Sequence, residues 1–144
     1  MPLGKDKSSD PHVIVAYDTK GLHFTVHNGK YRASEQWLTL AHEFVHAEEI
    51  VRTGTLDPNN GLQYSFKRTL PGGLKHHEAI YRYEADTVGI APRIDKRQRG
   101  RATENSIRKE NRIPLRRTYG LPSLYAINAV SPQLFDFSFS KLKK

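Results

Sequence analysis

The motif H-E-F-V-H at residues 42–46 is the feature that most constrains this chain. Residues 34–53 around it predict an amphipathic α-helix, because Ser34 suits the N-cap and Gly54 suits the stop. Side chains four residues apart lie on one face of a helix, so the two imidazoles would point the same way. Two ring nitrogens on one face can bind a single Zn²⁺. The helix is therefore expected to carry the functional centre.

This spacing indicates a zinc hydrolase, and most simply a peptidase. His42 and His46 are the predicted metal ligands, and Glu43 would reach the same side of the metal as a general base. In this hypothesis Zn²⁺ lowers the pKa of its bound water, and Glu43 takes the proton and returns it to the leaving amine. The alternative is that both histidines are surface residues on an ordinary amphipathic helix.

Composition narrows the class of protein. The 144 residues are enough for one domain, and we expect a disordered leader over residues 1–11 and a single domain over residues 12–144. No apolar run reaches the roughly 18 residues of a membrane span. The polar N-terminus lacks the apolar core of a secretory signal peptide. Because the chain has no cysteine, any zinc must be held by histidine and carboxylate.

The net charge of +8 comes largely from cations crowded into residues 93–117. A solvated basic face and a contact surface for an acidic segment or a phosphate backbone both agree with this pattern. A basic nucleic-acid-binding module with an incidental H-E-x-x-H is therefore the alternative function. A metal-stabilised interaction domain is a third class, and Glu43 argues against it because a structural site has no use for a base.

The rest of the chain predicts an α+β domain that is mostly helical, with a short N-terminal β-hairpin. We place strands at residues 12–17 and 22–26, a loop at 55–73, and further helices at 74–88, 103–112 and 123–129. Such a hairpin could lie over the helix that carries His42 and His46, here called the metal helix, and pair with an extended substrate. Thr103 is the expected N-cap of the 103–112 helix, and Pro114 ends it.

A catalytic zinc site needs a third protein ligand and leaves the fourth position for water. The downstream candidates are His76, His77, Glu78, Glu84 and Asp86. Glu84 is the first choice because a mid-helix position beside a packed face can aim it rigidly. His77 is its main rival or an outer partner of the ligands, whereas His76 and Glu78 are expected to be solvated.

The oxyanion formed during hydrolysis needs a hydrogen-bond donor besides the metal. Tyr119, which follows a run of arginines, is the first candidate, and Arg117 is the second. The alternative for Tyr119 is a half-buried packing role. Asn105 is expected to fix residues around the ligands rather than to be catalytic.

Three blocks of sequence occur in a fixed order and point to a known family. They are A-H-E-F-V-H-A at residues 41–47, E-A-D-T-V-G at 84–89, and T-E-N-S-I-R at 103–108 with P-L-R-R-T-Y at 114–119. Together they resemble the NleD-like effector family of zinc metallopeptidases. The resemblance implies a small zincin-like metallopeptidase domain of the gluzincin type. It also implies Zn²⁺ bound by His42, His46 and Glu84, with Glu43 as the general base.

Domains similar to this family also occur at the C-termini of toxins delivered by bacterial secretion systems, including spike- and Rhs-type proteins. The resemblance therefore implies a zinc endopeptidase that acts on a protein substrate, and the basic segment favours an acidic one. We expect a secretion apparatus or a cognate immunity protein as a further partner, and neither nucleic acid nor a membrane span. The chain would be cytoplasmic before delivery into a target cell by a dedicated secretion system.

Overall fold

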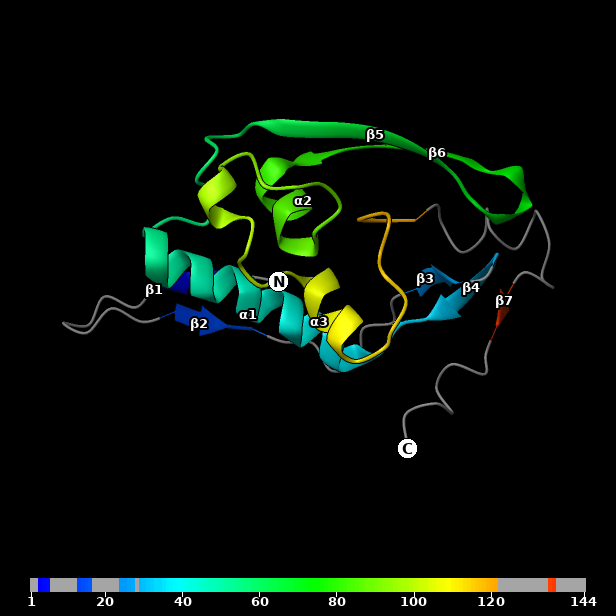
Figure 1. The fold of residues 1–144 in the computed structure, drawn as a ribbon, viewed down its shortest axis with the longest axis horizontal. Coiled ribbons are helices and arrows are strands. Elements are labelled where there is room, and N and C mark those ends of the chain that lie inside the picture. The colour runs from blue at the N-terminus through cyan, green and yellow to red at the C-terminus, as the bar shows by residue number, and fades with distance from the viewer. Residues whose placement is uncertain (1–2, 6–12, 17–23, 28, 122–134, 137–144) are drawn as a thin grey trace.

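The computed structural model describes residues 3–5, 13–16, 24–27, 29–121 and 135–136 (Figure 1). Within these residues lie three α-helices, which are α1 (Gln36–Thr53), α2 (Arg82–Val88) and α3 (Glu104–Glu110). Seven short strands accompany them, so the described part is a small mixed α/β fold and contains more strand than expected. None of the described helices has the length and apolarity needed to cross a membrane.

Helix α1 is the central element, and its predicted position is confirmed. It contacts α2, α3 and the two N-terminal strands (Figure 1). Gly54 ends it in the left-handed conformation with φ of 83°, as its sequence predicts. Glu35, rather than Ser34, is the N-cap, and it makes no side-chain cap bond. The Ser34 hydroxyl instead accepts a 3.0 Å hydrogen bond from Nη2 of Arg108.

The predicted hairpin between residues 12–17 and 22–26 is wrong. Strand β2 (Val13–Val15) pairs antiparallel with β1 (Leu3–Lys5), which lies inside the segment expected to be a disordered leader. The rest of that leader, and residues 18–21 between the two predicted strands, lie outside the described residues.

The second predicted strand finds its partner on its C-terminal side. Strand β3 (Phe24–His27) pairs antiparallel with β4 (Lys30–Ala33), and β4 also pairs in parallel with β7 (Phe135–Asp136). The connection contains Asn28-Gly29, a dipeptide typical of two-residue hairpin turns, and Gly29 has φ of 74°.

The predicted loop at residues 55–73 and most of the predicted helix at 74–88 are replaced by a hairpin. Strand β5 (Gln63–Thr69) pairs antiparallel with β6 (Lys75–Tyr81) through a turn at Pro71–Gly73, and only α2 is helical. In both strands partly or fully buried residues alternate with exposed ones, which is the period of a strand and not of a helix. The hairpin arches over α2, and β6 leads directly into it (Figure 1).

The interior of the described residues is small and unusually polar. Its buried apolar side chains are Tyr31, Leu38, Val45, Ile50, Phe66, Leu70, Ala85 and Val88. Its buried ionisable side chains are Arg32, His42, Glu43, His46, Glu49, Glu78, Asp86, Arg93, Glu104 and Arg108. Since a buried charge is tolerated only when it is paired or bound to a metal, ion pairs must position much of this fold. The helix expected at residues 123–129 lies outside the described residues.

Helix α3 begins and is capped as the sequence predicts. The Thr103 hydroxyl accepts from the backbone N–H of Ser106 at 3.0 Å, and the Ser106 hydroxyl accepts from the backbone N–H of Thr103 at 2.9 Å. This capping box fixes the start of the helix against the end of α2. There Gly89 has φ of 89°, and a Cβ added to it would lie 2.8 Å from the Thr103 hydroxyl.

We therefore expect Gly89→Ala to destabilise the protein by about 1–3 kcal/mol, because the substitution combines left-handed backbone strain with a steric clash. Urea denaturation measures this loss. Gly100→Ala is the matched control, since a Cβ there would meet nothing within 4 Å. Equal stability of the two variants would contradict the close packing of α2 on α3.

Candidate metal centre

Three potential metal ligands converge between α1 and α2. The Nε2 atoms of His42 and His46 lie 3.0 Å apart. Oε1 of Glu84 lies 3.3 Å from the His42 nitrogen and 2.5 Å from the His46 nitrogen. Both histidines are buried, and Glu84 is partly buried. The structure thus brings together the three side chains that the sequence analysis proposed as ligands.

The spacing and the donor atoms fit one metal ion. Zinc bonds of about 2.0–2.1 Å in a tetrahedron place neighbouring ligand atoms about 3.3 Å apart. The His42–His46 and His42–Glu84 distances of 3.0 and 3.3 Å are close to that edge, whereas the His46–Glu84 distance of 2.5 Å is that of a hydrogen bond and would lengthen around an ion. Two imidazoles and one carboxylate, with a fourth position left, are the donor set of catalytic zinc sites.

The outer nitrogens of both imidazoles are already occupied. Nδ1 of His42 lies 2.9 Å from Oε1 of Glu104, and since an ionised carboxylate can only accept, this nitrogen carries a proton. Nδ1 of His46 lies 3.2 Å from the Thr87 hydroxyl. Such outer contacts orient the rings of metal-binding histidines and leave the Nε2 lone pairs for the metal.

The carboxylates around His42 favour a positive charge at this position. Burial disfavours a charged His42, but its hydrogen bonds to Glu104 and Glu84 raise its pKa to about 9. Burial likewise opposes ionisation of Glu84, and the bonds from His42 and His46 nevertheless bring its pKa below the ordinary value. A bound metal ion would replace the proton and be stabilised by the same negative charges.

Glu104 was not among the predicted site residues, although it is the most enclosed carboxylate of the site, with 1% of its surface exposed. Besides His42, it accepts hydrogen bonds of 2.7 Å from Nε of Arg108 and from Nη1 of Arg116. Although burial opposes it, these contacts lower the pKa of Glu104 to about 2. Glu104 therefore stays ionised beside the metal centre.

Glu43 lies on α1 next to His42 and is buried, with 8% of its surface exposed. Burial raises its pKa above the ordinary value, and the nearby His42 and His46 only partly oppose this effect. A carboxylate with a raised pKa is better able to hold a proton near neutral pH than an exposed one.

Tyr119 also reaches the site. Its hydroxyl donates to Oε2 of Glu84, and its ring stacks against His42 with centroids 6.2 Å apart. Burial and the Glu84 charge raise the pKa of Tyr119, so its hydroxyl keeps its proton. Arg117, the second candidate for the oxyanion donor, is exposed. The neighbouring Arg116 instead lies over the Tyr119 ring, with its guanidinium carbon 5.3 Å from the ring centroid.

The other candidates for the third ligand lie elsewhere. His77 is exposed on β6, on the opposite face from His76 and Glu78, because the segment is a strand and not a helix. Asp86 pairs with Arg82 at 3.0 Å. Glu78, expected to be solvated, is buried: its carboxylate accepts from the backbone N–H groups of Tyr119 and Gly120.

Asn105 holds the same C-terminal segment. Its side-chain amide donates to the carbonyl of Arg116 at 2.8 Å, and its carbonyl accepts from the Arg116 backbone N–H at 2.7 Å. It therefore fixes the backbone of the residue that contacts Glu104, which is the positioning role expected from the sequence. Tyr83, which precedes Glu84, packs edge-on against His46 with ring centroids 5.7 Å apart.

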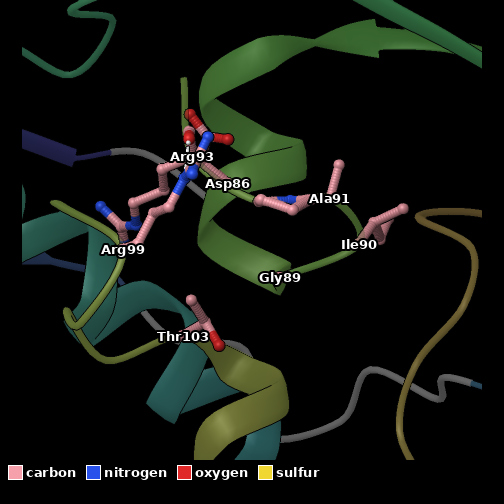
Figure 2. Close-up of a pocket in the computed structure, with 8 residues that line it drawn as sticks. Asp86, Gly89, Ile90, Ala91, Arg93, Arg99 and Thr103 are labelled. Carbon is pink, nitrogen blue, oxygen red and sulfur yellow. Dashed lines mark hydrogen bonds between the residues drawn. The ribbon is translucent and has the colours of Figure 1, made fainter. Parts of the chain in front are cut away.

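A pocket of about 310 Å³ lies at the end of α2 and is lined by none of the three potential ligands (Figure 2). It is lined by Asp86, Gly89, Ile90, Ala91, Pro92, Arg93, Arg99 and Thr103. In Figure 2 Asp86, Arg93 and Arg99 gather on one side, and Thr103 lies near the end of α2. Because none of the three potential ligands lines this pocket, we place the chemistry between α1 and α2 and not here.

Comparison with known proteins agrees with the geometry. The family of effector proteins named Peptidase M91 matches residues 3–119. The chain belongs to this family. The resemblance to NleD-like effectors is thereby confirmed, and membership in Peptidase M91 suggests a protease. No curated protein and no solved structure was found to be similar to the chain.

Replacing Glu104 by Gln should weaken zinc binding by about 10–100-fold, because the amide removes the charge that orients His42 and balances a cation. Competition with a chromophoric chelator measures this change. Glu110→Gln, in an exposed position on the same helix, is the matched control and should bind zinc like the parent. Unchanged affinity in Glu104→Gln would show that this contact has no part in metal binding.

Proposed function

We propose that this M91 protein is a zinc-dependent endopeptidase that hydrolyses a protein substrate. The observation that carries the proposal is the meeting of His42, His46 and Glu84 within 4.8 Å of one another, with Glu43 beside them on α1. Family membership supports the reaction class. The zincin-like fold expected from the sequence is part of the same proposal, supported by a metal helix that holds two of the three donors.

Each residue has a distinct role in this proposal. His42, His46 and Glu84 hold Zn²⁺, and Glu104 and Thr87 keep the two imidazoles oriented. When bound, the metal supplies Lewis acidity towards a water molecule and a peptide carbonyl. Glu43 accepts the proton of the attacking water and passes it to the leaving amine, a transfer favoured by its raised pKa.

Tyr119 is proposed to donate a hydrogen bond to the oxygen that becomes negative when the peptide carbonyl is attacked. Its protonated hydroxyl lies at Glu84, next to the metal position, so a small shift would bring it to a bound substrate. The Arg116 guanidinium lies over the Tyr119 ring and also donates a hydrogen bond to Glu104. Arg117, in contrast, is exposed.

The biological setting is proposed from family and charge. Membership among effector proteins supports delivery into a target cell by a secretion system. Exposed cations at Lys96, Arg97, Arg99 and Arg101 favour an acidic substrate segment or an acidic immunity protein.

Metal analysis tests the first half of the proposal. The purified parent should contain about one zinc ion per chain by elemental analysis. His46→Ala and Glu84→Ala should each lose it, because two remaining ligands bind a metal far more weakly than three. A parent that takes up no zinc after zinc is added back would rule out the proposed enzyme.

Replacing Glu43 by Gln tests the second half. The amide cannot accept the proton from water, so cleavage of fluorescently labelled casein should fall by about 10²–10⁴-fold, while the zinc content stays at one ion per chain. Glu48→Gln on the exposed side of the same helix is the control and should retain activity. Cleavage by Glu43→Gln at the parent rate would refute its role as general base.

A further inference from the structure

We propose that Glu78 is a positioning residue that holds the Tyr119 hydroxyl at the metal centre. The inference rests on the proposed function, because it assigns Glu78 a part in the reaction through Tyr119. Glu78 itself contacts none of the three potential ligands in the described structure.

The contact joins two parts of the chain that are distant in sequence. Oε2 of Glu78 accepts from the backbone N–H of Tyr119 at 2.8 Å, and Oε1 accepts from the backbone N–H of Gly120. One carboxylate thus binds two successive amides, 41 and 42 residues further along. Charge-assisted bonds of this kind are about twice as strong as neutral ones.

Glu78 is well placed to act as a rigid anchor. It sits in the middle of β6 opposite Phe66 of β5, and both side chains are buried. Six residues later, after β6 passes into α2, the chain provides the ligand Glu84. The continuous segment from β6 into α2 therefore carries both Glu78, which accepts from the Tyr119 backbone, and Glu84, which accepts from the Tyr119 hydroxyl.

The segment that carries Tyr119 has no regular secondary structure and depends on side-chain anchors. Asn105 and Glu104 hold it at Arg116, three residues before the tyrosine. Glu78 holds it at Tyr119 and just after it, so the phenol projects from between two fixed points. The fit at the second point is close, since a Cβ added to Gly120 would lie 3.2 Å from Oε1 of Glu78.

The chemistry of the contact favours a functional role over hairpin stability. Burying a carboxylate is costly unless its oxygens are bonded, and an apolar residue would serve packing better. Here the contacts of the carboxylate run to His76 at 3.0 Å and to the two amides, which belong to the segment of the proposed oxyanion donor.

Amide hydrogen exchange of the zinc-loaded protein tests the anchor without any substrate. Glu78→Gln keeps one carbonyl acceptor and should speed exchange at Tyr119 and Gly120 by about tenfold, and Glu78→Ala by more. Exchange in α1 should be unchanged, and Glu110→Gln should behave as the parent throughout. Parent-like exchange at Tyr119 and Gly120 in Glu78→Gln, the variant of unchanged size, would overturn the proposal.

A double-mutant cycle tests the link to the hydroxyl. On labelled casein, Glu78→Gln should lower kcat towards the value of Tyr119→Phe with little change in KM, and should cost nothing further once Tyr119 is already Phe. Losses that multiply in the double variant would show that Glu78 acts through general stability, and would overturn the positioning role. If the parent itself cleaves nothing, the proposed function fails, whereas the exchange rates still decide whether Glu78 holds Tyr119.

Discussion

The buried carboxylate of Glu104 is the contact on which the rest of the structure depends. It binds His42 from α1, Arg108 from its own helix and Arg116 from the segment that follows α3. Removing one member of such a network leaves another charge buried without a partner, at a cost of about 3–5 kcal/mol. The same carboxylate that joins these three elements also fixes which nitrogen of His42 faces the metal. Folding and the proposed metal binding therefore rely on one set of contacts.

The parts of the site that lie close together in sequence could be predicted from it. The spacing of His42 and His46 implies a helix with both rings on one face, and α1 confirms that helix. Thr103 was expected to begin α3 and does so. Glu84 was chosen as the third ligand on the assumption of one long helix, and it meets the two histidines although only its own short stretch is helical. The expected mid-helix position is not observed, since Glu84 lies in the first turn of α2.

Long-range contacts explain what could not be predicted. Glu104 meets His42 across 62 residues, and Glu78 meets Tyr119 across 41. In sequence both look like solvated glutamates, since nothing nearby records their burial. The β5–β6 hairpin was missed for a different reason: its alternation of exposed and buried residues includes charged and polar ones on both faces, so the hydrophobic signal is weak. The Pro71-Gly72-Gly73 turn was the clearest signal of that hairpin.

Burial also changes what the basic segment at residues 93–117 means. Arg93 and Arg108 are buried, and Arg116 is partly so; each pairs with an internal carboxylate, at Glu49 for the first and Glu104 for the other two. These arginines stabilise the metal helix and its surroundings and add little to the surface field. A nucleic-acid-binding surface would need them exposed, so the case for one rests on fewer cations than the sequence contains. In a domain this small, the location of each charge says more about function than the net charge does.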